Sequence, residues 1–202
     1  MSVLRRPFDA IGRARVAIFT FFAVYALSVV LGVAMVLTGD ALALRRRDEI
    51  VADARTGAIS AADRAGDRVQ AAALDFASNL VLGAIPSTIT GLSVVGSYPV
   101  AAYRGWIGGV VSVDADRGNR LADPRRALYY VVTLVLQLIP YSIAGGMGVY
   151  VGVGLWRELW RHPGRWSISL PRDRITDTAL AYAVVAPLFL VASFWEFLAP
   201  GR

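Results

Sequence analysis

Apolar residues along this chain gather into long runs, with polar segments between them. The runs cover residues 16–37, 76–113, 127–155 and 179–198. The first run carries no charge, and a helix of that length, at about 1.5 Å per residue, crosses a hydrocarbon core of roughly 30 Å. This pattern predicts an all-α membrane protein, a polytopic helical bundle that forms one membrane domain over residues 1–202.

Interruptions in two of the runs affect the number of spans. Residues 76–113 are too many for one span and few for two. Two prolines and two glycines interrupt them: Pro86, Gly91, Gly96 and Pro99. We expect one good span, a break, and a second short span that ends near residue 113. Pro140 is expected to break the helix over 127–155, because proline removes a backbone donor. About five crossings with broken helices result, and a re-entrant pair in place of two spans is the alternative.

Charges at the two ends of the apolar runs indicate an orientation. Four arginines lie at or before the start of the first run: Arg5, Arg6, Arg13 and Arg15. Arginine beside a first span places the N-terminal segment, residues 1–15, in the cytoplasm. Residues 156–178 combine Trp156, Trp160 and Trp166 with five arginines. That mixture suits the headgroup level of the same inner face.

The polar segment over residues 38–75 carries six arginines and seven acids, so its charge is nearly balanced. Thr56 and Gly57 divide it, and Ser60 with Asp63 resembles a helix-capping pair. We expect a helical hairpin on the outer face of the membrane. A helix that lies on the lipid surface is the alternative, although its apolar face is thin and rich in alanine.

Composition supports the membrane assignment and narrows the chemistry. Hydrophobic residues make up 56% of the chain, against about 45–50% in soluble domains. The absence of cysteine excludes disulfides, thiolate metal sites and cysteine nucleophiles. The single histidine, His162, lies in a polar segment, and no metalloprotease motif or acidic cluster occurs in a span. We therefore expect no enzyme activity, no cofactor, no metal and no nucleic-acid partner.

Glycines in the third run look at first like a nucleotide-binding loop. A phosphate loop needs a preceding strand and a lysine or a ribose-reading acid, and this stretch has neither. Ala144, Gly148 and Gly152 instead share one helical face at a spacing of four, and Gly105 with Gly109 repeats that spacing. Small residues so placed let helices approach closely in lipid. We interpret them as packing surfaces. The alternative is a gating or cavity-lining helix around Pro140 and Gly145.

Polar residues inside the apolar runs are the candidate functional groups. They are Asn79, Arg104, Gln137 and Glu196. A central arginine costs about 2.5–3.5 kcal/mol on insertion scales. Arg104 should therefore reach the headgroup level, or find a partner such as Glu196.

Four segments together resemble the stage II sporulation protein M family of polytopic membrane proteins. They are residues 75–80 (DFASNL), 103–109 (YRGWIGG), 138–152 (LIPYSIAGGMGVYVG) and 192–200 (ASFWEFLAP). They occur in the order found in the family and span most of the chain. Arg104 stands where the family usually has asparagine, and the usual acid just before the proline is absent, with Gln137 the nearest polar group.

The resemblance implies a multi-pass protein of a prokaryotic cell (inner) membrane. Members in sporulating bacteria are implied to act with cell-wall hydrolases at the engulfing membrane. We accordingly expect a non-enzymatic subunit of an envelope assembly, with the lipid bilayer and other membrane proteins as partners. The alternative is a permease-like or channel-like transport component whose broken helices surround a path.

The two glycine strips also predict self-association. A five-span bundle is expected to bury one strip against its own helices and to leave the other facing lipid. A strip of exposed backbone gains nothing there unless another helix covers it. We therefore expect a homo-oligomer, most simply a dimer. Convergence of Gln137, Asn79 and Arg104 on an accessible cavity would instead favour transport.

Overall fold

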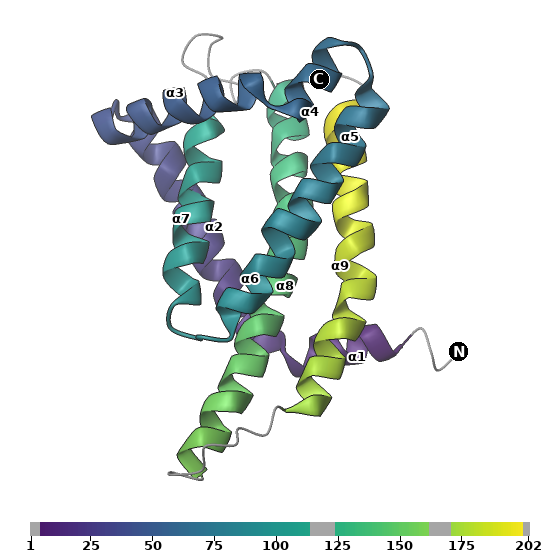
Figure 1. The fold of residues 1–202 in the computed structure, drawn as a ribbon. Coiled ribbons are helices and arrows are strands. Elements are labelled where there is room, and N and C mark those ends of the chain that lie inside the picture. Colours follow the sequence, from purple (N-terminus) through teal and green to yellow (C-terminus); the bar gives the residue numbers. More distant parts are fainter. Residues whose placement is uncertain (1–4, 114–123, 162–170, 200–202) are drawn as a thin grey trace.

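The computed structural model describes residues 5–113, 124–161 and 171–199, and every regular element within them is a helix (Figure 1). This confirms the all-α prediction. The elements are α1 (Arg6–Arg13), α2 (Arg15–Leu37), α3 (Ala41–Thr56), α4 (Ala58–Arg64), α5 (Arg68–Ala77), the π-helix η1 (Ser78–Ala84), α6 (Ile85–Gly91), α7 (Ser97–Val111), α8 (Pro124–Arg161) and α9 (Arg172–Leu198). His162 and Trp166 lie outside the described residues.

Four stretches of helix are long and apolar enough to cross a membrane. They are Arg15–Leu37, Arg68–Gly91, Ala127–Arg161 and Arg172–Leu198. The second combines α5, η1 and α6. A further pass along the bundle is made by α7, which returns beside α2 (Figure 1). It has 15 residues and is therefore about 22 Å long, shorter than an average hydrocarbon core. The fifth crossing expected from the sequence is thus a short helix inside the bundle.

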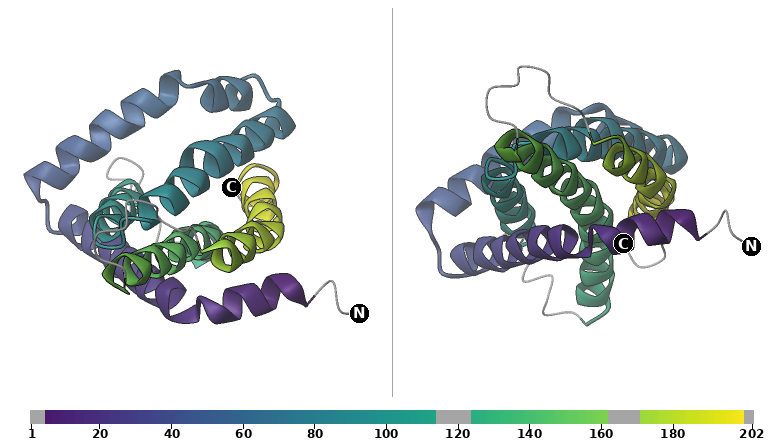
Figure 2. Two further views of the ribbon diagram at one scale, coloured as in Figure 1. Left: turned by 60° about the horizontal axis from the view of Figure 1, so that its bottom comes forward. Right: turned by 90° about the horizontal axis from the view of Figure 1, so that it is seen from below.

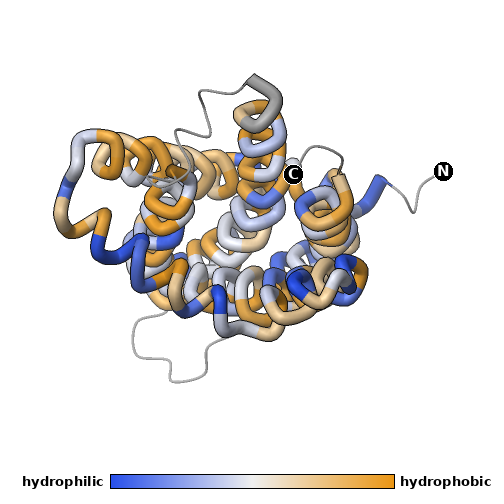
Figure 3. Tube along the Cα trace, turned by 90° about the horizontal axis from the view of Figure 1, so that it is seen from above, coloured by the Kyte–Doolittle hydropathy of each residue, from blue (hydrophilic) through white to orange (hydrophobic). Residues whose placement is uncertain are grey.

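The polar segment between the first two spans is helical, as expected, but it forms three pieces. Gly39, with a φ of +78°, turns the chain from α2 into α3. The Asp40 carboxylate caps α3 by accepting from the backbone of Leu42 and Ala43, and Asp67 caps α5. Seen from that end, α3 and α4 follow one another along one side of the bundle, and polar residues are prominent in α3 (Figure 3). The end that carries α3 is called the α3 end below, and the opposite end the α1 end.

Both glycine strips are buried against helices of the same chain. A Cβ at Gly109 would lie 2.1 Å from the carbonyl oxygen of Val29 in α2, and one at Gly105 would lie 2.4 Å from that of Tyr25. A Cβ at Gly148 would lie 2.1 Å from the carbonyl oxygen of Thr88 in α6. The expectation that one strip faces lipid is therefore wrong, because α2 covers the strip on α7 and α6 covers the strip on α8.

The expected break at Pro140 does not occur, since α8 continues through it from Pro124 to Arg161. Membrane helices tolerate proline when neighbouring helices enclose the freed backbone group, and Pro140 is buried. The break expected within residues 76–113 is present. It consists of η1 followed by a turn between α6 and α7, in which Val94 has a φ of +57°.

An ion pair fastens the first helix to the last one at the α1 end. Arg13 Nε donates to Asp177 Oδ2 at 2.8 Å, and Asp177 is buried. Hydrogen bonding to Asp177 raises the pKa of Arg13 above its ordinary value. Above this pair, Met147, Val185 and Phe189 form the main apolar core between α8 and α9. The pair explains why α1 lies against the base of α9 in every view (Figures 1 and 2).

Candidate ligand-binding cleft

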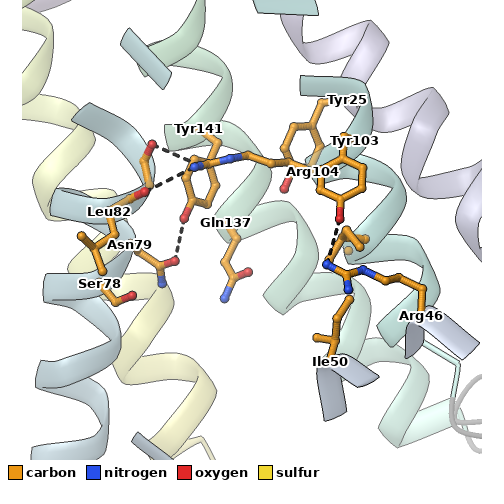
Figure 4. Close-up of a pocket in the computed structure, with 13 residues that line it drawn as sticks. Tyr25, Arg46, Ile50, Ser78, Asn79, Leu82, Tyr103, Arg104, Gln137 and Tyr141 are labelled. Carbon is orange, nitrogen blue, oxygen red and sulfur yellow. Dashed lines mark hydrogen bonds between the residues drawn. The ribbon is translucent and has the colours of Figure 1, made fainter. Parts of the chain in front are cut away.

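A cleft of about 440 Å³, apolar over most of its surface but lined by several polar side chains, opens between α2, α7, η1 and α8, with α3 at its margin (Figure 4). Asn79, Arg104 and Gln137, which are far apart in the sequence, all line it. The other lining residues are Tyr25, Arg46, Ile50, Ser78, Leu82, Gly83, Tyr103, Ile107, Gly108 and Tyr141. Three of the four candidate polar residues therefore meet at one accessible site at membrane depth.

Proline chemistry bears on one of the carbonyls that η1 presents to this cleft. Pro86 has no backbone N–H and cannot donate to the carbonyl of Leu82, four residues earlier. Arg104 Nη2 donates to that carbonyl at 3.3 Å, and Arg104 Nη1 donates to the carbonyl of Gly83 at 3.2 Å. A hydroxyl from Ser87 also bonds to Gly83 O, at 2.8 Å. The arginine of α7 thus bridges the cleft to a helix whose own hydrogen bonding is interrupted.

Arg104 therefore adopts neither of the arrangements expected from the sequence. It turns into the bundle rather than toward a headgroup, and its oxygen partners are backbone carbonyls and Ser87 Oγ, at 3.3 Å. No carboxylate among the described residues forms an ion pair with it. Its guanidinium carbon lies 5.9 Å from the centre of the Tyr141 ring, where the ring face attracts a cation. The guanidinium of Arg104 is thus held in a defined orientation, without an ion-pair partner among the described residues.

Asn79 belongs to a hydrogen-bonded chain that joins α5, η1, α8 and α9. Asn79 Nδ2 donates to Asp75 Oδ2 at 2.8 Å, and Asn79 Oδ1 accepts from the Tyr141 hydroxyl at 2.7 Å (Figure 4). Ser193 Oγ donates to the same Asp75 oxygen at 2.7 Å. Tyr25 stacks on Tyr141 with ring centres 6.3 Å apart. This chain holds Tyr141 in the position at which it meets Arg104.

Glu196 interacts with Gln137 and not with Arg104. Gln137 Nε2 donates to Glu196 Oε2 at 2.7 Å. The hydroxyl of Tyr129 also donates to the backbone carbonyl of Glu196 at 2.5 Å. These bonds fasten α8 to the last turns of α9. Gln137 is thereby oriented with its amide nitrogen toward the acid.

At its α3 end the cleft is bordered by an arginine from outside the spans. Arg46 Nη2 donates to the Tyr103 hydroxyl at 3.0 Å, and Arg46 Nη1 pairs with Glu49 at 2.7 Å. Hydrogen bonding to Glu49, and then to Tyr103, raises the pKa of Arg46 above its ordinary value. The polar segment is thus joined to α7 at the mouth of the cleft.

The glycine-rich set predicted from the sequence lies outside the cleft. Its members are buried in helix contacts: Pro140, Ala144, Gly145, Gly148, Gly152, Gly105 and Gly109. A Cβ at Gly145, for example, would meet the ring of Phe21 at 2.3 Å. Packing, not gating, is what these positions do in this structure.

Several cleft residues were missed by the sequence analysis. Tyr25, Tyr103 and Tyr141 are ordinary residues in apolar runs, and only their partners reveal a polar role. A readable signal did exist for Arg104, since Pro86 predicts one unpaired carbonyl at Leu82.

The groups present suit binding better than bond-breaking chemistry. The described residues contain no cluster of three or more histidine, aspartate or glutamate side chains that could hold a metal ion. The cleft offers guanidinium, phenol and amide groups from α2, α3, η1, α7 and α8. No family model, curated protein or solved structure matches this chain.

Proposed function

We propose that this chain is a non-enzymatic, permease-like component of a cell membrane, in which the polar cleft takes up a solute. The observation that carries the proposal is the convergence of Asn79, Arg104 and Gln137 on one open cleft. Polar residues at membrane depth are costly, and they normally mark a substrate path or a water-filled cavity. A π-helix at the same place agrees with this, because such irregular turns are frequent at functional sites.

The cleft is closed toward the α1 end by the contact between α6 and α8. Gly91 and Gly148 meet there without side chains between them. Thr88 Oγ1 donates to the carbonyl of Ala144 at 2.9 Å and lies 2.8 Å from the Tyr182 hydroxyl. Passage of a solute toward the α1 end would therefore require α6 and α8 to separate.

Membership of an envelope assembly, the function first expected from the sequence, is the second proposal, and its support is the resemblance to the stage II sporulation protein M family. The predicted dimer loses its structural basis, because both glycine strips are already covered within the chain. We retain the proposed orientation, with the N-terminus in the cytoplasm of a prokaryotic cell. A cysteine in place of Ala58 should then react in intact cells with a reagent that does not cross the membrane.

Cysteine labelling tests the central proposal cleanly, since the chain has no cysteine of its own. Ser78 lines the cleft, and Ser78→Cys changes one atom. We expect charged, membrane-impermeant methanethiosulfonate reagents to label this variant when they reach the α3 end. Leu27→Cys is the control, because Leu27 lies in the first span with 70% of its surface exposed on the outside of the bundle. It should stay unlabelled in a membrane. Failure of every charged reagent to label Ser78→Cys would remove the proposal.

A further inference from the structure

We infer that the cleft selects an oxyanion, a phosphate or carboxylate group held between Arg104 and Arg46. This inference rests on the proposed function and assigns its ligand class. Two guanidinium groups line the cleft, and none of its lining residues is acidic. A positive, partly desolvated cleft concentrates anions and repels cations.

Carboxylates near the cleft do not line it and are already paired or hydrogen-bonded. At the mouth, Glu49 pairs with Arg46 at 2.7 Å, so the unpaired charge of the cleft is that of Arg104. Asp75 accepts from Asn79 and Ser193, and Glu196 accepts from Gln137. In both cases the cleft-lining amide turns its nitrogen toward the acid. Arg104 itself forms no ion pair with a carboxylate among the described residues. An anionic ligand would supply that partner.

Arg104 has unused N–H donors that could bind such a ligand. A guanidinium has five N–H donors, whereas its present bonds run from Nη1 and Nη2 to neutral oxygens at 3.2–3.3 Å. Charge-assisted bonds to an oxyanion are shorter, about 2.7–2.9 Å. The carbonyls of Leu82 and Gly83 and the ring of Tyr141 restrict the rotation of the group. Little side-chain freedom is therefore lost when an anion replaces one of the long bonds.

Phenol groups complete the set of donors. The Tyr103 hydroxyl accepts from Arg46, so its own proton is available to a ligand. The Tyr25 hydroxyl has no hydrogen bond within the described part of the chain, and its ring is held by Tyr141. Arg46, Tyr103 and Arg104 come from α3 and α7, and Tyr25 comes from α2. An anion that enters at the α3 end would meet Arg46 first and Arg104 deeper in the cleft.

The experiment compares an anionic with a cationic thiol reagent on the same cysteine. We use sulfonatoethyl and trimethylammonioethyl methanethiosulfonate on Ser78→Cys, and divide their rate ratio by the ratio at the surface position Ala58→Cys. The normalised ratio should favour the anionic reagent by about tenfold, given a cation within several ångströms of the reaction site. A ratio of one, or a preference for the cationic reagent, overturns the oxyanion assignment while leaving an accessible cleft. If neither reagent labels Ser78→Cys, the proposed function itself is contradicted.

Substitutions then identify the charge responsible. Arg104→Gln should bring the normalised ratio close to the surface value, whereas Arg104→Lys, which keeps the charge, should preserve the preference for the anion. Arg157→Gln is the matched control, because Arg157 lies near the end of α8, away from the cleft. An Arg104→Gln ratio equal to that of the parent would refute the role of Arg104. If a variant fails to fold, the normalised labelling ratio of Ser78→Cys alone still tests whether the cleft prefers anions.

Two protection arms distinguish a free anion from a lipid headgroup. In phosphatidylcholine vesicles, millimolar inorganic phosphate should slow the labelling of Ser78→Cys at least threefold if the ligand is soluble. If the ligand is a headgroup, phosphatidylglycerol in the vesicles should give that protection and inorganic phosphate should not. If neither inorganic phosphate nor phosphatidylglycerol protects Ser78→Cys, the assignment of an oxyanion site is overturned.

Discussion

The contact between α6 and α8 and the cleft between α7 and η1 are adjacent parts of one bundle with opposite construction. In the α6–α8 contact, Gly148 lies so close to the Thr88 carbonyl that no side chain fits between them. Across the cleft, the helices stand far enough apart for a whole arginine side chain to extend from α7 to η1. The first region excludes everything except backbone, and the second admits polar groups.

Both regions nevertheless use the same acceptor, the backbone carbonyl. At the contact the carbonyl of Thr88 faces the backbone of Gly148, an arrangement that suits weak Cα–H···O contacts. At the cleft the carbonyls of Leu82 and Gly83 accept from a charged side chain. The comparison teaches that a proline in one helix, and an arginine in its neighbour, replace a close-packed surface with a cleft lined in part by polar groups.

The largest effect should come from filling the α6–α8 contact. In Gly148→Leu the new Cβ would meet backbone atoms of Thr88 at 2.1–2.9 Å, and backbone cannot move aside cheaply. We expect a loss of about 3 kcal/mol or more in unfolding free energy, measured by SDS titration in a mild detergent. Gly12→Leu is the control, because nothing lies within 4 Å of its Cβ. Equal stability of the two variants would contradict the packing described here.

A smaller effect should distinguish two adjacent glycines in α7. A Cβ at Gly109 would lie 2.1 Å from the Val29 carbonyl, whereas one at Gly108 would lie 3.9 Å from the Val29 side chain. Gly109→Ala should therefore lower the unfolding free energy by about 2 kcal/mol. Gly108→Ala should be neutral or slightly stabilising, because alanine favours the helix. The same titration decides it, and a reversed order would show that α7 packs on α2 through another face.

The smallest effect belongs to the hydrogen-bonded wall of the cleft. Tyr141→Phe removes the donor to Asn79, and bonds between membrane helices average about 0.6 kcal/mol. Tyr98→Phe, whose hydroxyl meets Thr20 at 2.9 Å in an exposed position, should cost less. A double-mutant cycle with Asn79→Ala should show that Tyr141 and Asn79 are coupled and that Tyr98 and Asn79 are not. A coupling energy of zero for the first pair would mean that this bond adds nothing to the cleft wall.

Local pattern was sufficient to predict the spans and the glycine faces. Residues 16–37 are apolar throughout, and α2 covers Arg15–Leu37. A spacing of four shows that Gly148 and Gly152 share a face, but it contains no information about the helix that covers it. The prediction that one strip faces lipid failed for this reason. The covering helices are α6 for the strip on α8 and α2 for the strip on α7, and nothing in the spacing of the glycines identifies them.

The effects of two prolines could not be predicted from the local sequence pattern. Pro140 was expected to end a helix, but α8 encloses it and continues. Pro86 was treated as a simple interruption, although its missing N–H prepares the carbonyl that Arg104 binds. Which of these outcomes a proline produces depends on neighbours that are distant in sequence. The cleft was predictable in its polar members Asn79, Arg104 and Gln137, and not in the tyrosines that orient them.

The ion pair between Arg13 and Asp177 joins a helix that is synthesised early to one that is synthesised late. Its two residues are 164 positions apart in the chain. The N-terminal helix therefore leaves the ribosome long before its partner exists, and closing so long a loop carries an entropic cost that only the finished bundle offsets. A nascent chain that stops before α9 keeps Arg13 unpaired and the base of the bundle open. The ion pair at the α1 end can thus form only after α9 has been synthesised.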